Sequence, residues 1–228
     1  MQEATPETSA DRLTAIRARI AAAARLARRP TEDIALIAVS KTRSAEDILP
    51  LIVQGQMLFG ENRVQEAASK WPALKALHPG VQLHLIGQLQ SNKAEEAVAL
   101  FDMIHSVDRL SLVAALGKAM QKQQRQIPCF IQVNIGAEEQ KGGCSVADLP
   151  ALLQAAEEYA IPVAGLMCIP PANVEAAPFF ALLAELAARH HLSQISMGMS
   201  DDFETAIMLG ATYVRVGTAL FGERASTV

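Results

Sequence analysis

The chain has 228 residues, half of them hydrophobic, which is enough for one sizeable buried core. A net charge of −4 and an aromatic content of 4% argue against a nucleic-acid-binding surface. No apolar run reaches the roughly 20 residues that span a bilayer. The three cysteines, Cys129, Cys144 and Cys168, are widely spaced, which is typical of reduced thiols in a cytoplasmic protein.

The first predicted element is a helix over about residues 8–28. Thr8 and Asp11 have the spacing of a capping box, and four apolar residues fall on one side of the helix: Leu13, Ile16, Ile20 and Ala24. The arginines and alanines of this stretch also resemble an organelle transit peptide. Transit peptides avoid acids, however, and three acids precede the arginine-rich stretch: Glu3, Glu7 and Asp11. We therefore expect a packed leading helix.

From Ile34 onward, strand-like and helix-like segments alternate. The predicted strands are residues 34–41, 56–60, 81–86, 102–106, 128–135, 162–169, 194–197 and 212–216. The predicted helices are 44–54, 64–77, 92–100, 108–124, 146–159, 174–190 and 201–209, with a break at Trp71-Pro72. This order predicts parallel pairing and a single (β/α)8 TIM-type barrel over about 34–222, in one domain spanning 1–228. An open doubly wound sheet is the alternative, but no Gly-x-Gly-x-x-Gly follows any strand.

The first predicted strand ends in a lysine. Strand alternation places Lys41 on the same face as Ile37 and Val39, at the edge of an apolar interior. Desolvation lowers the pKa of a lysine, and the neutral amine is the nucleophile that forms a Schiff base. The alternative, more common for lysines in general, is a side chain that buries its stem and extends its ammonium into water.

Other polar residues gather at the carboxyl ends of the predicted strands, which form the working face of such a barrel. Asn62 follows the second strand and His84 lies in the third. Near the end of the chain, Ser200 is predicted at a helix N-terminus, where free N–H groups attract an anion. Gly198 and Gly217 are expected to let the backbone approach a ligand. Ordinary capped turns are the alternative, but an amine and a phosphate site on one rim predict pyridoxal 5′-phosphate (PLP).

Several motifs then follow one another in a fixed order over about residues 34–222. They are Ala38-Val-Ser-Lys-Thr42, Phe59-Gly-Glu-Asn-Arg-Val-Gln-Glu66, His84-Leu-Ile-Gly-Gln-Leu-Gln-Ser-Asn-Lys93, Ser106-Val-Asp-Arg109, Gln132-Val-Asn-Ile135, Gly165-Leu-Met167, Ser196-Met-Gly-Met-Ser-Asp201 and Val214-Arg-Val-Gly-Thr-Ala-Leu-Phe-Gly222. By these motifs the chain resembles the pyridoxal phosphate homeostasis protein family, the YggS/PROSC group of PLP-binding barrels. The resemblance implies a barrel similar to the N-terminal barrel of alanine racemase.

The resemblance also implies roles for individual residues. Lys41 corresponds to the lysine that holds PLP as an internal aldimine. The other positions are assigned as follows: Ser200, Gly217 and Thr218 to the phosphate, Arg215 to the pyridine nitrogen, and Asn62 to the ring. His84 matches the family motif and is taken as a further cofactor-binding residue. Arg63 stands where many relatives carry an aromatic residue, which leaves the shape and charge beside the cofactor open.

Arg215 has a chemical consequence of its own. It shares a strand face with Tyr213, so an inward Tyr213 implies an inward Arg215. A guanidinium only donates hydrogen bonds, so a pyridine nitrogen facing it stays unprotonated. PLP enzymes that need a strong electron sink usually place an Asp there, so we expect a poor carbanion stabiliser. The alternative for Arg215 is a salt bridge at the barrel rim with Glu61 or Glu223.

The favoured interpretation is a monomeric protein that carries or buffers PLP for PLP-dependent apoenzymes, without turnover. The alternative is an amino-acid racemase that uses Lys41 and either His84 or water as its bases. A barrel aldolase, whose lysine bonds its substrate directly, is a third hypothesis and predicts a colourless protein. No metal site is predicted, because His190-His191 suits a helix end, and Cys168 in an apolar strand is expected to be inert.

Overall fold

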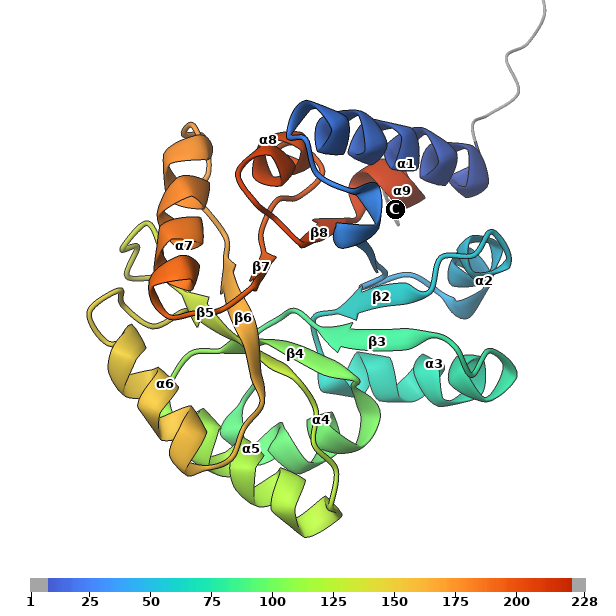
Figure 1. Cartoon of the computed structure of the whole chain (residues 1–228). Coiled ribbons are helices and arrows are strands. Elements are labelled where there is room, and N and C mark those ends of the chain that lie inside the picture. The colour runs from blue at the N-terminus through green and yellow to red at the C-terminus, as the bar shows by residue number, and fades with distance from the viewer. Residues whose placement is uncertain (1–7, 223–228) are drawn as a thin grey trace, which may run out of the picture.

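The computed structural model describes residues 8–222, in which eight parallel strands form a closed barrel in chain order (Figure 1). The strands are β1 (Ala35–Val39), β2 (Leu58–Glu61), β3 (Gln82–Leu85), β4 (Met103–Val107), β5 (Cys129–Val133), β6 (Val163–Cys168), β7 (Gln194–Ser196) and β8 (Tyr213–Val216). β8 pairs with β1, with Ile37 beside Arg215, and so closes the barrel. The predicted (β/α)8 fold is confirmed.

Helices follow the strands around the outside of the barrel. They are α2 (Ala45–Val53), α3 (Val64–Leu77), α4 (Ala94–Leu100), α5 (Leu110–Gln123), α6 (Leu149–Glu158), α7 (Ala177–Arg189), α8 (Phe203–Met208) and α9 (Thr218–Phe221). Short 3-10 helices, η1 (Thr31–Asp33) and η2 (Ser91–Lys93), precede β1 and α4. In the part of the chain that the structure describes, no helix combines the length and apolar character needed to cross a membrane.

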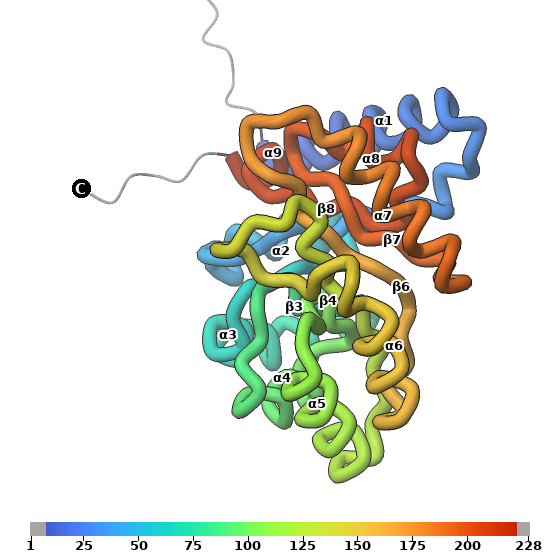
Figure 2. Tube along the Cα trace, turned by 90° about the vertical axis from the view of Figure 1, so that its left-hand side faces the viewer, coloured from blue at the N-terminus to red at the C-terminus, as the bar shows by residue number. Residues whose placement is uncertain are grey.

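The leading helix, α1 (Ser9–Leu26), has the predicted cap and the predicted buried face. Thr8 Oγ1 accepts a hydrogen bond from the Asp11 N–H, and the Asp11 carboxylate accepts one from the Thr8 N–H. All four apolar residues of the predicted face are buried: Leu13, Ile16, Ile20 and Ala24. α1 and α9 lie side by side in both Figure 1 and Figure 2. The Arg12 Nε–H donates to the Leu220 carbonyl at 2.7 Å, which ties the two ends of the described chain together.

Two predicted boundaries were wrong. The first strand ends at Val39 rather than residue 41, because Thr42 adopts a positive φ of 61° that reverses the chain. Helix α3 continues through Trp71-Pro72. Pro72 removes one N–H from the helix, while the buried Trp71 anchors it with a 3.0 Å bond from its Nε1–H to Glu61 Oε1.

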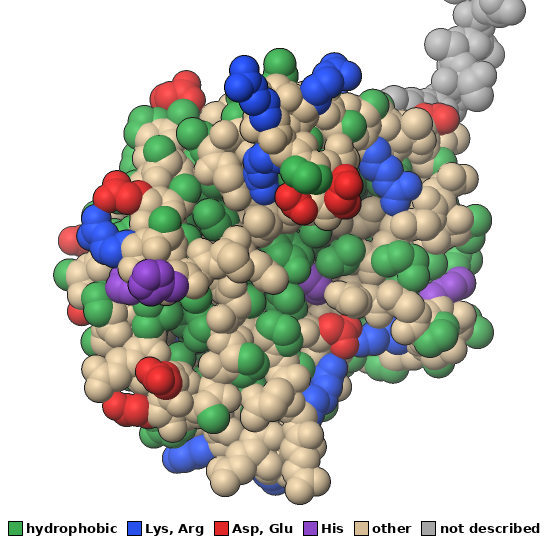
Figure 3. Space-filling view, viewed as in Figure 1, with side chains coloured by type: hydrophobic (Ala, Val, Ile, Leu, Met, Phe, Trp, Pro, Cys, Tyr) green, Lys and Arg blue, Asp and Glu red, His purple; other side chains and the backbone are tan. Residues whose placement is uncertain are grey.

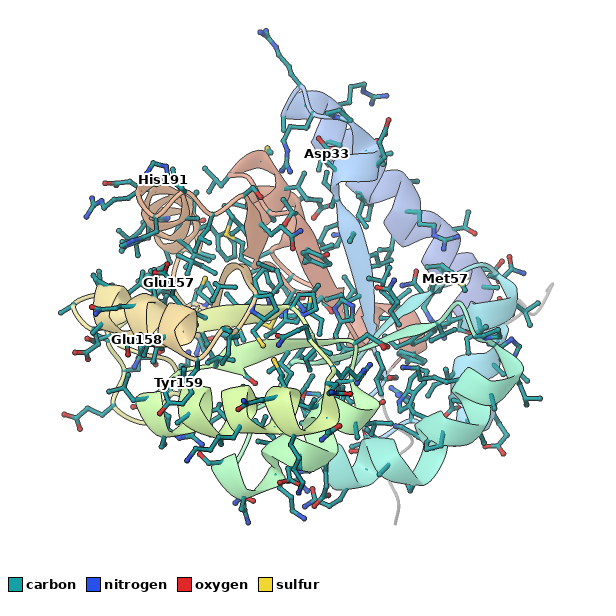
Figure 4. All side chains as sticks on the ribbon, turned by 60° about the horizontal axis from the view of Figure 1, so that its bottom comes forward. Asp33, Met57, Glu157, Glu158, Tyr159 and His191 are labelled. Atoms are coloured by element: carbon teal, nitrogen blue, oxygen red, sulfur yellow. The ribbon has the colours of Figure 1, made fainter. Side chains whose placement is uncertain are left out.

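α9 was not predicted, because four residues are too few to show helical periodicity. It begins directly after β8 and therefore marks the carboxyl-terminal end of the barrel, toward the left of Figure 2. The opposite end is formed by the loops that enter the strands. Asp33, Met57, Tyr159 and His191 lie in these loops or at helix ends beside them (Figure 4).

Candidate cofactor site

A cavity of about 530 Å³ opens at the carboxyl-terminal end of the barrel. Its lining brings together six of the seven predicted site residues: Lys41, Asn62, Ser200, Arg215, Gly217 and Thr218. These residues follow or end the strands β1, β2, β7 and β8, and closure of the barrel makes these strands neighbours. The seventh, His84, is not among the lining residues.

Lys41 lies on a turn beyond β1, and its side chain is exposed at the cavity. Lys41 lies two residues beyond the end of β1, outside the predicted strand, and it lines the cavity together with Val39. Neighbouring groups hold the turn. The buried Ser40 hydroxyl donates to Glu61 Oε1 at 2.6 Å, and the Thr42 N–H donates to Glu66 Oε1 at 2.5 Å. The amine is therefore accessible to a ligand while its backbone is fixed.

The neighbouring part of the cavity, where β8 ends and α9 begins, is suited to an anion. Gly217 follows β8 and packs against the end of β1, where a Cβ added to it would lie 3.3 Å from the Cβ of Val39. Gly217 caps α9, whose first N–H groups have no acceptor within the helix. The hydroxyls of Thr218 and Ser200 supply further donors to the cavity. Free N–H and O–H groups converging on one corner can bind a phosphate.

The turn before α8 differs from its prediction. Ser200 does not begin the helix, since α8 starts at Phe203 and Asp202 occupies the N-cap. The Asp202 carboxylate accepts a hydrogen bond from the Met199 N–H at 2.6 Å, and partial burial raises the pKa of this acid. Gly198 has a φ of 88°, and a Cβ there would lie 2.9 Å from the Cα of Phe203. Gly198 thus allows the turn to pack on α8 and does not line the cavity.

Arg215 is buried at the floor of the cavity and points inward, as predicted. Its Nη1 donates to Ser196 Oγ at 2.6 Å, and its Nη2 donates to the Cys168 carbonyl at 2.9 Å. The alternative of a salt bridge to Glu61 was wrong, because Glu61 pairs with Lys70 at 3.0 Å instead. Glu223 lies outside the described residues. Burial lowers the pKa of the guanidinium, although its ordinary value is high enough to keep it charged.

His84 lies inside the barrel beneath the cavity. Its Nδ1 is 3.0 Å from Nε2 of the buried His105, whose Nδ1 is 2.9 Å from Ser196 Oγ. Burial lowers the pKa of His84 to about 4 and that of His105 well below its ordinary range. Both rings are therefore neutral at pH 7. They pack with Tyr213 and Phe130, and His105 stacks on Phe130 with ring centroids 4.4 Å apart.

Sequence reasoning missed several residues of this site. Gln132 of β5, Gln140 and Gly142 after β5, and Ile169 after β6 line another part of the cavity. Neither a polar amide nor a loop residue carries a signal that distinguishes a cavity wall from a solvated loop. Lys141 also lines the cavity, and its amine pairs with Glu138 at 2.6 Å.

Known proteins resemble this chain over nearly its whole length. A sequence model of the alanine racemase N-terminal domain matches residues 12–225. A pyridoxal phosphate homeostasis protein of Pseudomonas aeruginosa is 40% identical over 223 residues, 95% of this chain and 96% of that protein. The chain belongs to the pyridoxal phosphate homeostasis protein family. The resemblance drawn from the motifs is thereby confirmed.

Solved structures agree with this family. PipY of Synechococcus elongatus, solved with PLP bound, is 38% identical and superposes with a TM-score of 0.83 over 94% of this chain and 100% of that chain. Alanine racemase of Clostridium difficile is 15% identical, with a TM-score of 0.66 over 92% of this chain and 57% of that enzyme. The present chain and the racemase therefore share the barrel fold.

Proposed function

We propose that this protein binds pyridoxal 5′-phosphate in the cavity and acts in PLP homeostasis as a carrier or buffer. The observation that supports the proposal is that an accessible amine, Lys41, and the end of β8 at Gly217 and Thr218 line the same cavity on neighbouring strands. The PLP-bound structure of PipY, a relative of nearly the same length, supports the same cofactor here.

The residues present fit this cofactor. An aldehyde needs an amine, a phosphate needs N–H and O–H donors, and the cavity offers both at one corner. The missing side chain of Gly217 leaves room that a Cβ would narrow against Val39. Arg215 supplies a positive charge at the floor, for which no carboxylate among residues 8–222 forms an ion pair. An anionic ligand would compensate that charge.

Each residue then has a proposed role. When bound, PLP supplies an aldehyde that bonds covalently to an amine and an aromatic ring that absorbs visible light. Lys41 provides the amine, Ser200, Gly217 and Thr218 hold the phosphate, and Asn62 contacts the ring. Arg215 would face the ring nitrogen as a hydrogen-bond donor and would keep that nitrogen unprotonated. We propose that His84 acts on the site indirectly, through the hydrogen bonds that link it by way of His105 and Ser196 to Arg215.

The proposal includes no turnover, because the second amine at the cavity, that of Lys141, is ion-paired to Glu138 at 2.6 Å and donates to the Pro170 carbonyl at 2.9 Å. Among the described lining residues there is no His, Asp, Glu, Tyr or Cys, and the titratable ones are Lys41, Lys141 and Arg215. Tyr213 packs among the histidines inside the barrel, and Tyr159 ends α6 outside it. A racemase needs a base on each face of its substrate, and the geometry does not offer His84 for that purpose.

An absorbance titration with PLP tests the function. Wild type is expected to become yellow, and K41A to lose the covalent adduct while retaining weaker, non-covalent PLP. Borohydride followed by peptide mapping locates the attachment. An unchanged adduct in K41A would place the bond on another lysine and contradict the proposal. Sustained loss of optical activity from chiral amino acids, incubated with the PLP-loaded protein, would contradict the absence of turnover.

The proposal extends to partners and assembly. A carrier needs recipients, and PLP-dependent apoenzymes are the class that consumes this cofactor. We propose that the whole chain acts as one domain and as a monomer in solution. Mixing the loaded protein with a PLP-requiring apoenzyme, with recovery of the apoenzyme's activity as readout, checks the first point. Light scattering during size-exclusion chromatography checks the second.

A further inference from the structure

Lys70 on α3 is an almost buried cation that the proposed function does not use. Its side chain is 10% exposed, and that of Glu61 is fully buried. The Lys70 Nζ lies 3.0 Å from Glu61 Oε1 and 3.0 Å from Glu66 Oε1. Two carboxylates explain how the charge is neutralised, since a buried cation needs a partner. They do not explain where the remaining hydrogen bonds of Lys70 go.

Those bonds go to the turn that carries Lys41. The Lys70 ammonium donates to the Ser40 carbonyl at 3.0 Å and to the Arg43 carbonyl at 2.9 Å. These two carbonyls bracket Lys41 and Thr42. The same cluster binds the turn at two other points, through the Ser40 hydroxyl on Glu61 and the Thr42 N–H on Glu66. The ion cluster of Glu61, Glu66 and Lys70 therefore holds both sides of the two-residue turn.

The turn needs such support. Thr42 is β-branched and has a φ of 61°, a conformation that such residues rarely adopt. A residue held there persists when the surrounding structure fixes it. The exposed side chain of Lys41 has no burial of its own to hold it in place. Its position over the cavity therefore depends on the backbone of residues 40–43.

We propose that Lys70 is a positioning residue that holds the Lys41 turn in the geometry required for bonding to an aldehyde ligand. The inference rests on the proposed function in that Lys41 is taken as the cofactor-binding amine. Correct placement of a nucleophile raises its effective concentration toward the bound aldehyde. The phosphate side of the cavity is built from β7 and β8, so it does not depend on the Lys70 contacts.

The test compares K70M with K75M. Lys75 lies on the same helix and is also ion-paired, to Asp102 at 2.6 Å, but this pair is at the end of α3 away from the turn. K70M leaves Glu61 buried without its cation and is expected to lower stability. The double variant E61Q/K70M removes that charge as well, and its amide oxygen can still accept bonds from Ser40 and Trp71. If K70M does not fold, the same measurements are made on E61Q/K70M.

Two ligands separate positioning from general damage. One is PLP; the other is pyridoxine 5′-phosphate, which has an alcohol in place of the aldehyde and cannot bond to Lys41. We expect PLP affinity to fall about tenfold in K70M or the double variant, from loss of amine placement. Affinity for pyridoxine 5′-phosphate is expected to change less than twofold. K75M is expected to match wild type for both ligands.

Amide hydrogen exchange without any ligand gives an independent readout. The segment 40–44 is expected to exchange at least tenfold faster in the Lys70 variants and at the wild-type rate in K75M. Equal loss of affinity for both ligands would show a merely structural role and overturn the inference, as would unchanged PLP affinity and exchange. Failure of wild type to bind PLP would overturn the proposed function, whereas exchange at the turn would still decide whether Lys70 holds it.

Discussion

Arg215 places a charge where the fold alone gains little from it. Arg215 is 4% exposed, and its guanidinium is hydrogen-bonded to a hydroxyl and a carbonyl, both neutral groups. Desolvating a charge costs several kcal/mol in proteins unless an opposite charge compensates it. No ion pair with Arg215 is present in residues 8–222. The residue therefore fits a role in binding an anion more than a role in folding.

The variant R215M is therefore expected to weaken PLP binding without lowering the stability of the fold. Without PLP, the free energy of unfolding in urea should stay the same or rise by about 1 kcal/mol, because the variant removes a buried charge that Asp202 attracts only from beyond ion-pair distance. PLP affinity should fall at least tenfold, from loss of a charge-assisted hydrogen bond and of the positive field. R189M, at an exposed pair with Glu185 on α7, is the control for removing an arginine. A clear loss of stability in ligand-free R215M would show that the fold requires the charge.

At the scale of elements, α1 fastens the two short helices next to the site. Arg19 of α1 pairs with Glu204 of α8 at 2.7 Å, and Arg12 of α1 donates to the Leu220 carbonyl of α9 at 2.7 Å. Arg29, which follows α1, donates to the carbonyls of Ile207 and Ala211 at 2.9 and 2.8 Å. Lys and Arg side chains gather over α1 along the top of Figure 3. α8 and α9 follow the two loops that form the phosphate side, so α1 stabilises that side from behind.

The variant I16A tests whether packing of α1 stabilises the barrel. Ile16 is 3% exposed on the inner face of α1, and truncating it is expected to lower the free energy of unfolding by about 2–4 kcal/mol through lost burial and a residual cavity. L26A, at a residue 73% exposed on the same helix, is expected to change it by less than about 0.5 kcal/mol. Urea unfolding measures both. Equal small effects would mean that α1 adds little to the barrel.

The elements were largely predictable because each carries a local signal. The Thr8 capping box and the buried stripe of α1 are periodic patterns within one segment, and the alternation of strands and helices specifies the closed barrel. The residues after the strands could be grouped because a barrel brings all its carboxyl ends to one face. The exact end of β1 was not predictable, since the positive φ at Thr42 depends on contacts from α3.

The polar contacts beneath the site could not be read from the sequence. His84, His105, Ser196 and Arg215 come from four strands, and their chain of hydrogen bonds exists only in the closed barrel. The sequence predicts His105 only as a member of the strand over residues 102–106, and no local pattern shows that a strand histidine has hydrogen-bond partners. The same holds for Lys70, whose partners lie at Ser40 and Arg43.

At the scale of the whole molecule, the barrel interior holds two neutral histidines. The guanidinium of Arg215 can only donate, so Ser196 Oγ accepts from it and has its own hydrogen to give to His105 Nδ1. His105 then donates from Nε2 to His84 Nδ1, which leaves the proton of His84 on Nε2, an atom without a partner in the described part of the chain. Protonating either ring would add a second positive charge near Arg215.

Stability should therefore fall as the pH is lowered from about 6.5 to about 4. In this window the unfolded histidines, with pKa values near 6.5, bind protons, whereas folded His84, with a pKa of about 4, does not. The stability supplied by the neutral ring is complete above pH 6.5 and is lost toward pH 4, on the order of 3 kcal/mol for His84. Burial pushes the pKa of His105 in the same direction.

Urea unfolding of wild type and H84N at several pH values between 4.5 and 7 measures this dependence. Near pH 5 the free energy of unfolding of wild type is expected to change with pH more steeply than that of H84N, by about 1 kcal/mol per pH unit. Asp202, whose raised pKa acts in the opposite direction, is present in both proteins and cancels in the comparison. H191Q, at an exposed position, is expected to keep the wild-type slope. Identical slopes for wild type and H84N would mean that His84 binds a proton equally in the folded and unfolded states, and that the interior does not exclude its charge.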